Sequence, residues 1–581
     1  MKKLLNRQIA IVAVAVIATV AFFSFKSGDD RNFQIAKNLD IFNAIVKELD
    51  MFYVDTIDPN KTIREGIDNM LYTLDPYTEY FPEEDQSELE QMIKGSFGGM
   101  GSYIAYNTKL KRSMISEPFE GTPAAKAGLK AGDILMEIDG QDLAGKNNAE
   151  VSQMLRGQAG TSFKLKIERP NEKGGRTPME FTIVRESIQN PAIPYTAVLD
   201  NNVGYISLST FSGNPSKEFK KAFLDLKKQG ATSLVIDLRS NGGGLLDEAV
   251  EIANYFLPRG KVIVTTKGKI KQASNTYKTL REPLDLDIPI AVLVNSGTAS
   301  ASEILSGSLQ DLDRAVIVGN RTFGKGLVQQ PIDFSDGSAI RLTIARYYTP
   351  SGRCIQRPYE SGKDKNYELD IYNRYEHGEF FSRDSIKQNE NERYLTSLGR
   401  TVYGGGGIMP DVFVPQDTTG VTSYLSSVIN RGLTLQFTFQ YTDNNRKKLS
   451  QYETEEDLLN YLRHQGLVEQ FIRFADSKGV KRRNILIQKS YKRLEANIYG
   501  NIIYNMLGLE AYLKYFNKSD ATVQQGIELL EKGEAFPKAP AETEEEVTKD
   551  NKDGKKKRTA QAYGITEDPT RIFDFAEASI S

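Results

Sequence analysis

The sequence predicts a multidomain α/β protein in which a small β domain is inserted and helical regions lie at both ends. Strand-like and helix-like runs alternate over residues 200–416, which is typical of an α/β layer structure. Short β-like runs separated by glycines occupy residues 97–188. Apolar residues recur at three- and four-residue spacing within 33–96 and again beyond 421, which predicts amphipathic helices.

The composition is that of a globular protein and excludes several classes. The 581 residues are 39% hydrophobic and carry a net charge of −2, so no basic excess exists to neutralise phosphates and no nucleic-acid partner is expected. The single cysteine, Cys354, allows neither an intramolecular disulfide nor a cysteine zinc cage. With only His377 and His464, a histidine-rich metal site is nearly excluded, and a hydrolase is expected to use another base. We therefore expect no metal and no cofactor.

Residues 1–32 are predicted to be a signal anchor and a linker. Basic side chains at Lys2, Lys3 and Arg7 precede an uncharged, mainly apolar run over 8–25. This is the pattern of a secretory signal or signal anchor with its basic end in the cytoplasm, and the run is barely long enough to span a bilayer. We favour an uncleaved single-pass anchor in the inner membrane, with the remaining chain in the periplasm. The alternative is a cleaved signal and a soluble periplasmic protein.

The remaining chain divides into five predicted segments. They are a helical N-terminal domain (33–96), the β domain (97–188), the α/β core (189–416, with 358–400 as an insertion or mobile loop), a helical C-terminal domain (417–535) and a charged tail (536–581). The tail is predicted to be disordered because its blocks of like charge cannot bury enough apolar surface.

Ser300 lies in a candidate nucleophile segment. A buried-type strand is followed by small residues from Asn295 to Ser302 and then by a helical pattern. Small residues at a strand-to-helix turn permit a sharp bend that exposes a side chain. The helix N-terminus also offers unpaired N–H groups to a developing oxyanion. By itself, the same pattern fits a helix-capping serine.

Lys325 lies between Gly324 and Gly326, which allow the backbone to approach it closely. A lysine acts as a base only when it is neutral, so its usual pKa of about 10.4 must fall by several units, which burial can achieve. Alone, the segment also fits an ordinary loop. It is not a phosphate-binding P-loop, because the required order of glycine, lysine and serine or threonine is missing.

Taken together, these segments resemble the C-terminal processing peptidases, the tail-specific family of S41 serine peptidases with a PDZ domain. The resemblance rests on the run from Thr298 to Glu303, on Lys325 twenty-five residues after Ser300, and on Gln329 four residues further. It implies that Ser300 is the nucleophile, Lys325 the general base and Gln329 the residue that positions the lysine amine. Thr298 stands where relatives often carry serine.

Three further segments extend the resemblance. Asp237 to Gly244 ends a strand in a glycine cluster and resembles the loop that supplies one oxyanion N–H; we favour Gly243, with Gly242 left open. The N–H of Ala301 would be the second donor. Tyr403 to Asp411 resembles the run that closes the protease core. The loop that resembles the carboxylate-binding loop of a PDZ domain consists of Gly99, Met100, Gly101 and Ser102.

The resemblance covers roughly residues 33–416 and implies a crotonase-like ββα protease core with an inserted PDZ domain, flanked by helical N- and C-terminal regions. It implies a serine endopeptidase that binds C-terminal tails of proteins and cleaves them with a Ser-Lys dyad. The expected partners are proteins or peptides with accessible C-termini and the inner membrane, and a homo-oligomer stays open. Two alternatives are a non-catalytic PDZ adaptor on a degenerate core and acyl-CoA chemistry on a crotonase-like fold. Whether the PDZ domain gates the site or only recruits substrate stays open.

Overall fold

The computed structural model describes residues 30–539, apart from 87–88, 90–91, 93–94, 108–109, 120, 131, 171–174, 190 and 361–364. Both the predicted anchor (8–25) and most of the predicted tail (540–581) lie outside the described residues. Within the described part of the chain, no helix combines the length and the apolar character that crossing a bilayer requires.

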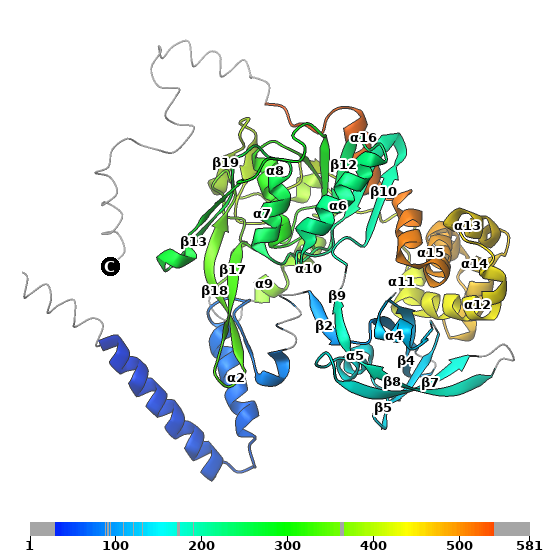
Figure 1. Ribbon diagram of the computed structural model, residues 1–581, viewed down its shortest axis with the longest axis horizontal. Coiled ribbons are helices and arrows are strands. Elements are labelled where there is room, and N and C mark those ends of the chain that lie inside the picture. The colour runs from blue at the N-terminus through cyan, green and yellow to red at the C-terminus, as the bar shows by residue number, and fades with distance from the viewer. Residues whose placement is uncertain are drawn as a thin grey trace, which may run out of the picture.

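A six-stranded sheet forms the centre of the molecule (Figure 1). Its order is β10 (Tyr195–Leu199), β11 (Val203–Ser207), β12 (Ser233–Asp237), β15 (Ile290–Val294), β16 (Val316–Gly319) and β21 (Val412–Phe413). Only the β10–β11 pair is antiparallel among these pairs. Strands β12 and β15 are buried along their whole length, as expected for parallel strands covered on both faces.

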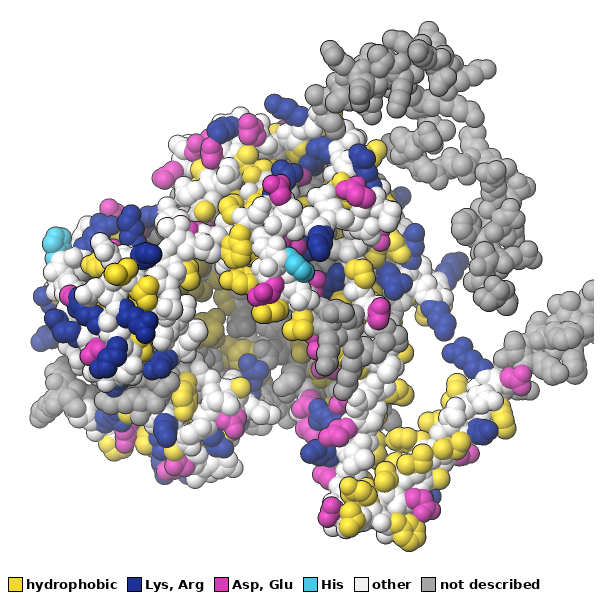
Figure 2. All heavy atoms as spheres, turned by 180° about the vertical axis from the view of Figure 1, so that it is seen from behind, with side chains coloured by type: hydrophobic (Ala, Val, Ile, Leu, Met, Phe, Trp, Pro, Cys, Tyr) yellow, Lys and Arg dark blue, Asp and Glu magenta, His cyan; other side chains and the backbone are white. Residues whose placement is uncertain are grey.

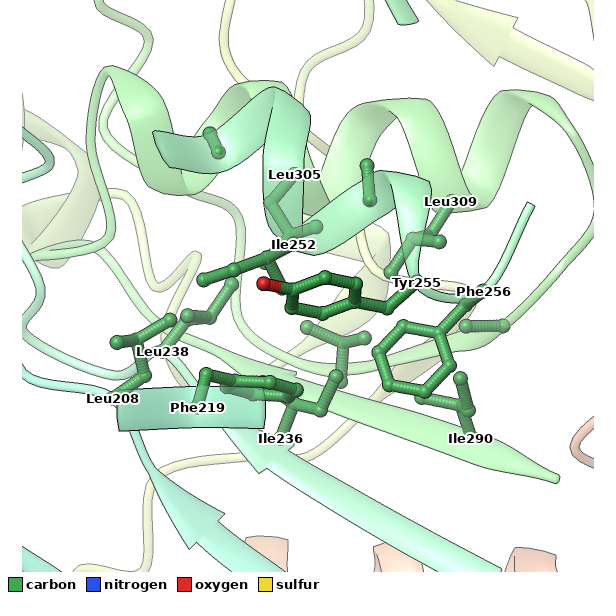
Figure 3. Packing of buried hydrophobic residues seen from close by; sticks show 14 of the residues in the cluster. Leu208, Phe219, Ile236, Leu238, Ile252, Tyr255, Phe256, Ile290, Leu305 and Leu309 are labelled. Atoms are coloured by element: carbon green, nitrogen blue, oxygen red, sulfur yellow. The ribbon is translucent and has the colours of Figure 1, made fainter. Parts of the chain in front are cut away.

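Helices cover both faces of this sheet. One face packs against α6 (Pro215–Lys228), α7 (Leu246–Asn254) and α8 (Ala301–Asp311). Figure 3 shows Phe219, Ile252 and Leu305 from these helices packed over Ile236 and Ile290 of the strands. The opposite face packs against α16 (Ala521–Glu531), the last described helix. The α/β architecture predicted from the alternating pattern is therefore confirmed.

A second sheet lies beside the first and contains β1 (Glu79–Phe81), β18 (Ala339–Tyr348), β13 (Val262–Gly268), β14 (Thr276–Lys278) and β17 (Leu327–Asp333). The helical prediction for 33–96 is wrong where the chain forms the strand β1 and, at Ser96, begins the strand β2 (Ser96–Gly99). A helix over residues 30–52 is followed by α2 (Pro59–Tyr72), but β1 then pairs antiparallel with β18. Figure 2 shows apolar side chains along the exposed helix 30–52.

The inserted β domain has its own apolar core. Its sheet contains β3 (Ser102–Asn107), β4 (Arg112–Pro118), β5 (Ile134–Ile138), β6 (Gln141–Asp142), β7 (Ser162–Pro170) and β8 (Arg176–Val184). The helices α4 (Pro123–Lys126) and α5 (Asn148–Leu155) complete it. The entering strand β2 (Ser96–Gly99) pairs with the leaving strand β9 (Glu186–Gln189), so the domain is attached through a two-stranded stem.

The segment 358–400, predicted to be an insertion or a mobile loop, is an insertion with helices and strands of its own. It contains α9 (Lys365–Glu368), α10 (Asp370–Glu376) and a hairpin of β19 (Arg393–Leu395) with β20 (Thr401–Tyr403). Arg374 is buried and donates to the carbonyl oxygens of Arg321 and Thr322, while Glu379 accepts from both arginines. Because ion pairs rather than a continuous apolar face order the segment, it has no period in the sequence.

The C-terminal helices form a separate bundle before the chain returns to the core. The bundle contains α11 (Ser423–Asn430), α12 (Leu433–Leu449), α13 (Glu455–Arg463), α14 (Leu467–Ser477) and α15 (Asn484–Asn517). In α12, Phe439 packs against Met114 and Ile134 of the β domain. The following α16 leaves the bundle and buries its apolar side against β12, β15 and β16. Thus α16 is part of the α/β core, which the predicted boundary at 417 does not anticipate.

We expect Ile527→Ala to lower the free energy of unfolding of the core by about 2–4 kcal/mol, because Ile527 is buried between α16 and the sheet. Exposed Glu528 on the same helix is the control, and Glu528→Ala is expected to change it by no more than about 0.5 kcal/mol. Chemical denaturation followed by circular dichroism measures both. Equal stabilities for the two variants would contradict the packing of α16.

Candidate active site

Ser300 stands at the sharp turn between β15 and α8. It caps α8 with φ 57° and ψ −118°, a conformation that a serine rarely adopts. The turn is tightly enclosed, because a Cβ atom added to Gly243 would lie 2.7 Å from the Ser300 Cβ. The strand–turn–helix context expected for a nucleophile is therefore present.

A buried carboxylate, that of Glu303, ties this turn to the lysine loop. It accepts the N–H of Ser300 at 2.9 Å, the N–H of Gly324 at 2.7 Å and the N–H of Lys325 at 2.9 Å. The hydroxyl of Thr322 donates to it as well. Burial raises the pKa of Glu303 to about 7, although these hydrogen bonds favour the ionised form. One side chain thus fixes the backbone on both sides of the site.

Tyr347 of β18 provides a second bridge between the same segments. Its side chain is fully buried, and its hydroxyl lies 3.2 Å from the carbonyl oxygen of Ser300 and 2.5 Å from that of Lys325. Strand β18 therefore holds the serine turn and the lysine loop together through their carbonyl oxygens, whereas Glu303 accepts their N–H groups.

The amine of Lys325 lies 4.5 Å from the centroid of the Tyr77 ring. Burial lowers the pKa of Lys325 to about 8; the positive charge of Arg341 adds to this, and the negative charges of Glu303 and Asp75 oppose it. A neutral amine is therefore accessible near neutral pH, which is the state that a general base requires. Tyr77 and Asp75 come from the segment after α2, which the sequence analysis assigned to the helical N-terminal domain.

Gln329 of β17 does not bond to the lysine amine in this structure. Its amide Nε2 donates to the hydroxyl of Thr343 on β18 at 3.3 Å, and that hydroxyl donates to Asp75 Oδ1 at 3.1 Å. Among the described residues, no hydrogen bond joins Gln329 to Lys325. Lys325 lies in the loop that leads into β17, and Gln329 lies on β17 itself. The positioning contact that the family resemblance implies is not formed.

The predicted oxyanion donors are only partly arranged. Gly243 has φ +97°, and a Cβ atom added to it would lie 2.8 Å from the Ala301 nitrogen, so its backbone adjoins the first turn of α8. However, the N–H of Gly243 donates to Asn241 Oδ1 at 2.9 Å. The expectation that Gly243 points its N–H into the site is therefore not met in this state, because Asn241 occupies that donor.

The candidate carboxylate-binding loop borders a cavity of about 340 Å³ between β3 and α5. Gly101 has φ +75°, and a Cβ atom there would lie within 2.6 Å of Thr122, so only glycine fits. The side chain of Met100 is 3% exposed and belongs to the domain core. Ile104 and Leu155 provide apolar wall at the side of the groove.

Comparisons with known proteins identify the family. Residues 202–368 match peptidase family S41, residues 114–169 match a PDZ domain, and residues 424–508 match a family of unknown function. The chain is 38% identical over 327 residues to a carboxy-terminal-processing protease of Bartonella bacilliformis, covering 56% of this chain and 73% of the relative. The chain belongs to the carboxy-terminal-processing proteases. It is a serine-type protease with a PDZ domain.

Other relatives belong to the same group. A probable CtpA-like serine protease of Staphylococcus aureus is 36% identical over 351 residues, covering 60% of this chain and 68% of the relative. Among solved structures, a photosystem II D1 C-terminal processing protease is 29% identical, with a TM-score of 0.34, covering 64% of this chain and 86% of that one.

Sequence reasoning overlooked four residues around the two candidate catalytic side chains of this protease: Asp75, Tyr77, Glu303 and Tyr347. The spacing of Ser300 and Glu303 was the one available signal, because a serine followed three residues later by glutamate forms a capping box. The others come from distant strands and loops, and no local pattern connects them to the lysine.

We expect Gly243→Ala to abolish peptide cleavage by this protease, because the new methyl group would collide with the backbone of Ala299 at 2.7 Å and with Ser300. Gly242→Ala is the matched control, since a Cβ atom at Gly242 meets nothing within 4 Å. Its free energy of unfolding is expected to stay within about 0.5 kcal/mol of the parent protein. Peptide cleavage and chemical denaturation measure the pair, and an active, stable Gly243→Ala protein would contradict the close contact.

Proposed function

We propose that this protease is an endopeptidase that binds C-terminal tails of proteins through its PDZ domain and cleaves them with a Ser300–Lys325 dyad. The observation that carries the proposal is the double bridge between the serine turn and the lysine loop. Glu303 accepts N–H groups from both segments, and the Tyr347 hydroxyl contacts carbonyl oxygens of both. A lysine whose pKa is lowered by burial then lies on the loop held in this way.

The proposed reaction follows from these positions. The Ser300 hydroxyl attacks the peptide carbonyl while the neutral amine of Lys325 takes its proton. The N–H of Ala301 and that of Gly243, once released from Asn241, stabilise the oxyanion. The lysine then protonates the leaving amine, and water hydrolyses the acyl-enzyme. Gln329 accepts a hydrogen bond from the lysine amine and orients it.

The PDZ domain supplies the proposed tail selectivity. Backbone N–H groups of the Gly99–Ser102 loop hold the terminal carboxylate, and the tail adds a strand beside β3. The apolar side chains of Ile104 and Leu155 along the groove support an apolar residue near the tail's end.

We propose the domain limits given from the sequence, with α16 assigned to the core.

The basic flank and apolar run at the N-terminus support a protease anchored in the inner membrane with its catalytic part in the periplasm, or released there after cleavage of a signal. The adaptor alternative is less well supported, because burying a lysine amine is costly and a purely binding protein has no use for it.

We expect Ser300→Ala to abolish cleavage of an unstructured test protein, because the nucleophile is lost while the turn is kept. Lys325→Met is expected to give the same loss, since it keeps the apolar stem beside Tyr77 and removes the base. Cleavage assays and circular dichroism measure activity and folding. A fully active, folded Ser300→Ala protein would refute the dyad.

The pH dependence of kcat/KM provides a second readout of the same dyad. Activity requires the neutral amine, so it is expected to rise as pH rises through the Lys325 pKa of about 8 and to level off above it. Arg341→Gln removes the cation that lowers this pKa, so its rise is expected at higher pH. An unchanged rise in this variant would contradict Lys325 as the titrating base.

We expect a substrate with an amidated C-terminus to show a raised KM and an unchanged kcat relative to the same substrate with a free carboxylate. Amidation removes the charge held by the Gly99–Ser102 loop but leaves the cleaved bond as it was. Steady-state kinetics on the matched pair of peptides tests this. Identical KM values would show that the PDZ domain does not read the terminal carboxylate.

A further inference from the structure

The segment Asp75–Thr78, between α2 and β1, lies directly against the lysine side of the candidate active site. The Tyr77 ring covers the Lys325 amine at 4.5 Å, and the Thr78 hydroxyl accepts the backbone N–H of Thr343 at 3.1 Å. Asp75 is 6% exposed and anchors the segment by accepting the N–H groups of Tyr77 and Thr78 at 2.8 and 2.9 Å. The N-terminal region thus reaches into the protease core.

A chain of hydrogen bonds runs from this segment to Gln329. Thr343 Oγ1 lies 3.1 Å from Asp75 Oδ1, and Gln329 Nε2 lies 3.3 Å from Thr343 Oγ1. Which group donates in each of these hydrogen bonds follows from the chemistry of the groups. An ionised carboxylate can only accept, so the Thr343 hydroxyl must give its single proton to Asp75. Thr343 can then only accept from Gln329, and the amide must present its NH₂ group to the threonine.

The orientation of the NH₂ group determines where the carbonyl oxygen of the Gln329 amide points. With its NH₂ group turned to Thr343, Gln329 has its carbonyl oxygen left to accept a hydrogen bond, and the lysine amine is a donor. An amide turned the other way would present a donor to that amine instead. The two arrangements have similar shape, so an acceptor-only neighbour is needed to select one.

We propose that Asp75 and Thr343 are positioning residues of this protease, which fix the orientation of the Gln329 amide so that its oxygen faces the lysine amine. The inference rests on the proposed Ser-Lys dyad. It assigns the N-terminal segment a part in catalysis that is exerted through Gln329. In this orientation the amide oxygen is the atom of Gln329 that is available to accept a hydrogen bond from the amine.

Thr343→Val is the test variant. Valine keeps the branched shape suited to β18, and the backbone N–H bond to Thr78 remains. Asp75 also keeps its other donors: the N–H groups of Tyr77 and Thr78, and the Thr78 hydroxyl at 2.7 Å. The change therefore removes only the two hydrogen bonds of the Thr343 hydroxyl, to Asp75 and to Gln329. We expect kcat to fall about 5- to 10-fold, the worth of one hydrogen bond, with KM unchanged.

Three comparisons separate this role from a merely structural one. Thr343→Ser keeps the hydroxyl and is expected to restore kcat to within about twofold of the parent. In a Gln329→Ala background, Thr343→Val is expected to cause no further loss, because the amide on which it acts is gone. Thr279→Val is the control. Thr279 directly follows β14 of the same sheet, and its buried hydroxyl donates to the carbonyl oxygen of Pro258, so kcat is expected to stay unchanged.

Thermal unfolding accompanies each assay, and Thr343→Ala replaces Thr343→Val if the valine protein does not fold. A parent-like kcat without the hydroxyl, equal losses in the valine and serine variants, or an additional loss in the Gln329→Ala background would each overturn the inference. Ser300→Ala, assayed in parallel, keeps the two levels distinct. An inactive Ser300→Ala protein together with a parent-like Thr343→Val protein refutes only the positioning role of Asp75 and Thr343. An active Ser300→Ala protein refutes the dyad itself.

Discussion

The buried carboxylate of Glu303 is the constraint on which the arrangement of the candidate active site depends. Removing an ionised carboxylate from water is costly unless several donors satisfy it. Here three of the four donors are backbone N–H groups, from Ser300, Gly324 and Lys325. Backbone donors come with the position of the chain itself, so satisfying this one carboxylate fixes the serine turn relative to the lysine loop. The Thr322 hydroxyl, the fourth donor, ties in the start of that loop.

This constraint also explains why the site draws on segments that are far apart in sequence. The carboxylate fixes the loop's backbone, but the amine at the end of a flexible four-carbon chain needs its own surroundings. Tyr77 provides a ring face for the amine, while β18 contacts the carbonyl oxygen of Lys325 through Tyr347 and the Gln329 amide through Thr343. The segment 358–400 supports the loop from outside through Arg374. The candidate lysine base is therefore surrounded and held by the N-terminal segment, α8, β18 and the insertion.

The local part of this site was predictable from the sequence, and the non-local part was not. Small residues before a helix and a lysine between glycines are local signals, and through the family resemblance their spacing led to Ser300 and Lys325 as candidates. Asp75 followed by proline is a typical helix stop, and nothing nearby shows that its carboxylate bonds to Thr343, 268 positions later. The engagement of the Gly243 N–H by Asn241 was equally hidden, because it depends on the rotamer of one side chain in the loop after β12.

The fold shows the same division. Periodicity revealed α16 as an amphipathic helix but could not show that its apolar side faces the central sheet rather than the neighbouring bundle. The position of α16 also affects a loop of the candidate active site. Asp520 caps α16 and also pairs with Arg239 at 2.7 Å, two residues before Asn241. The same C-terminal region contacts the PDZ domain through Phe439. The PDZ domain is held by this contact as well as by its β2–β9 stem, so its position relative to the loop that contains Gly243 is restrained at two places. Any large rotation of the domain must therefore break the Phe439 contact.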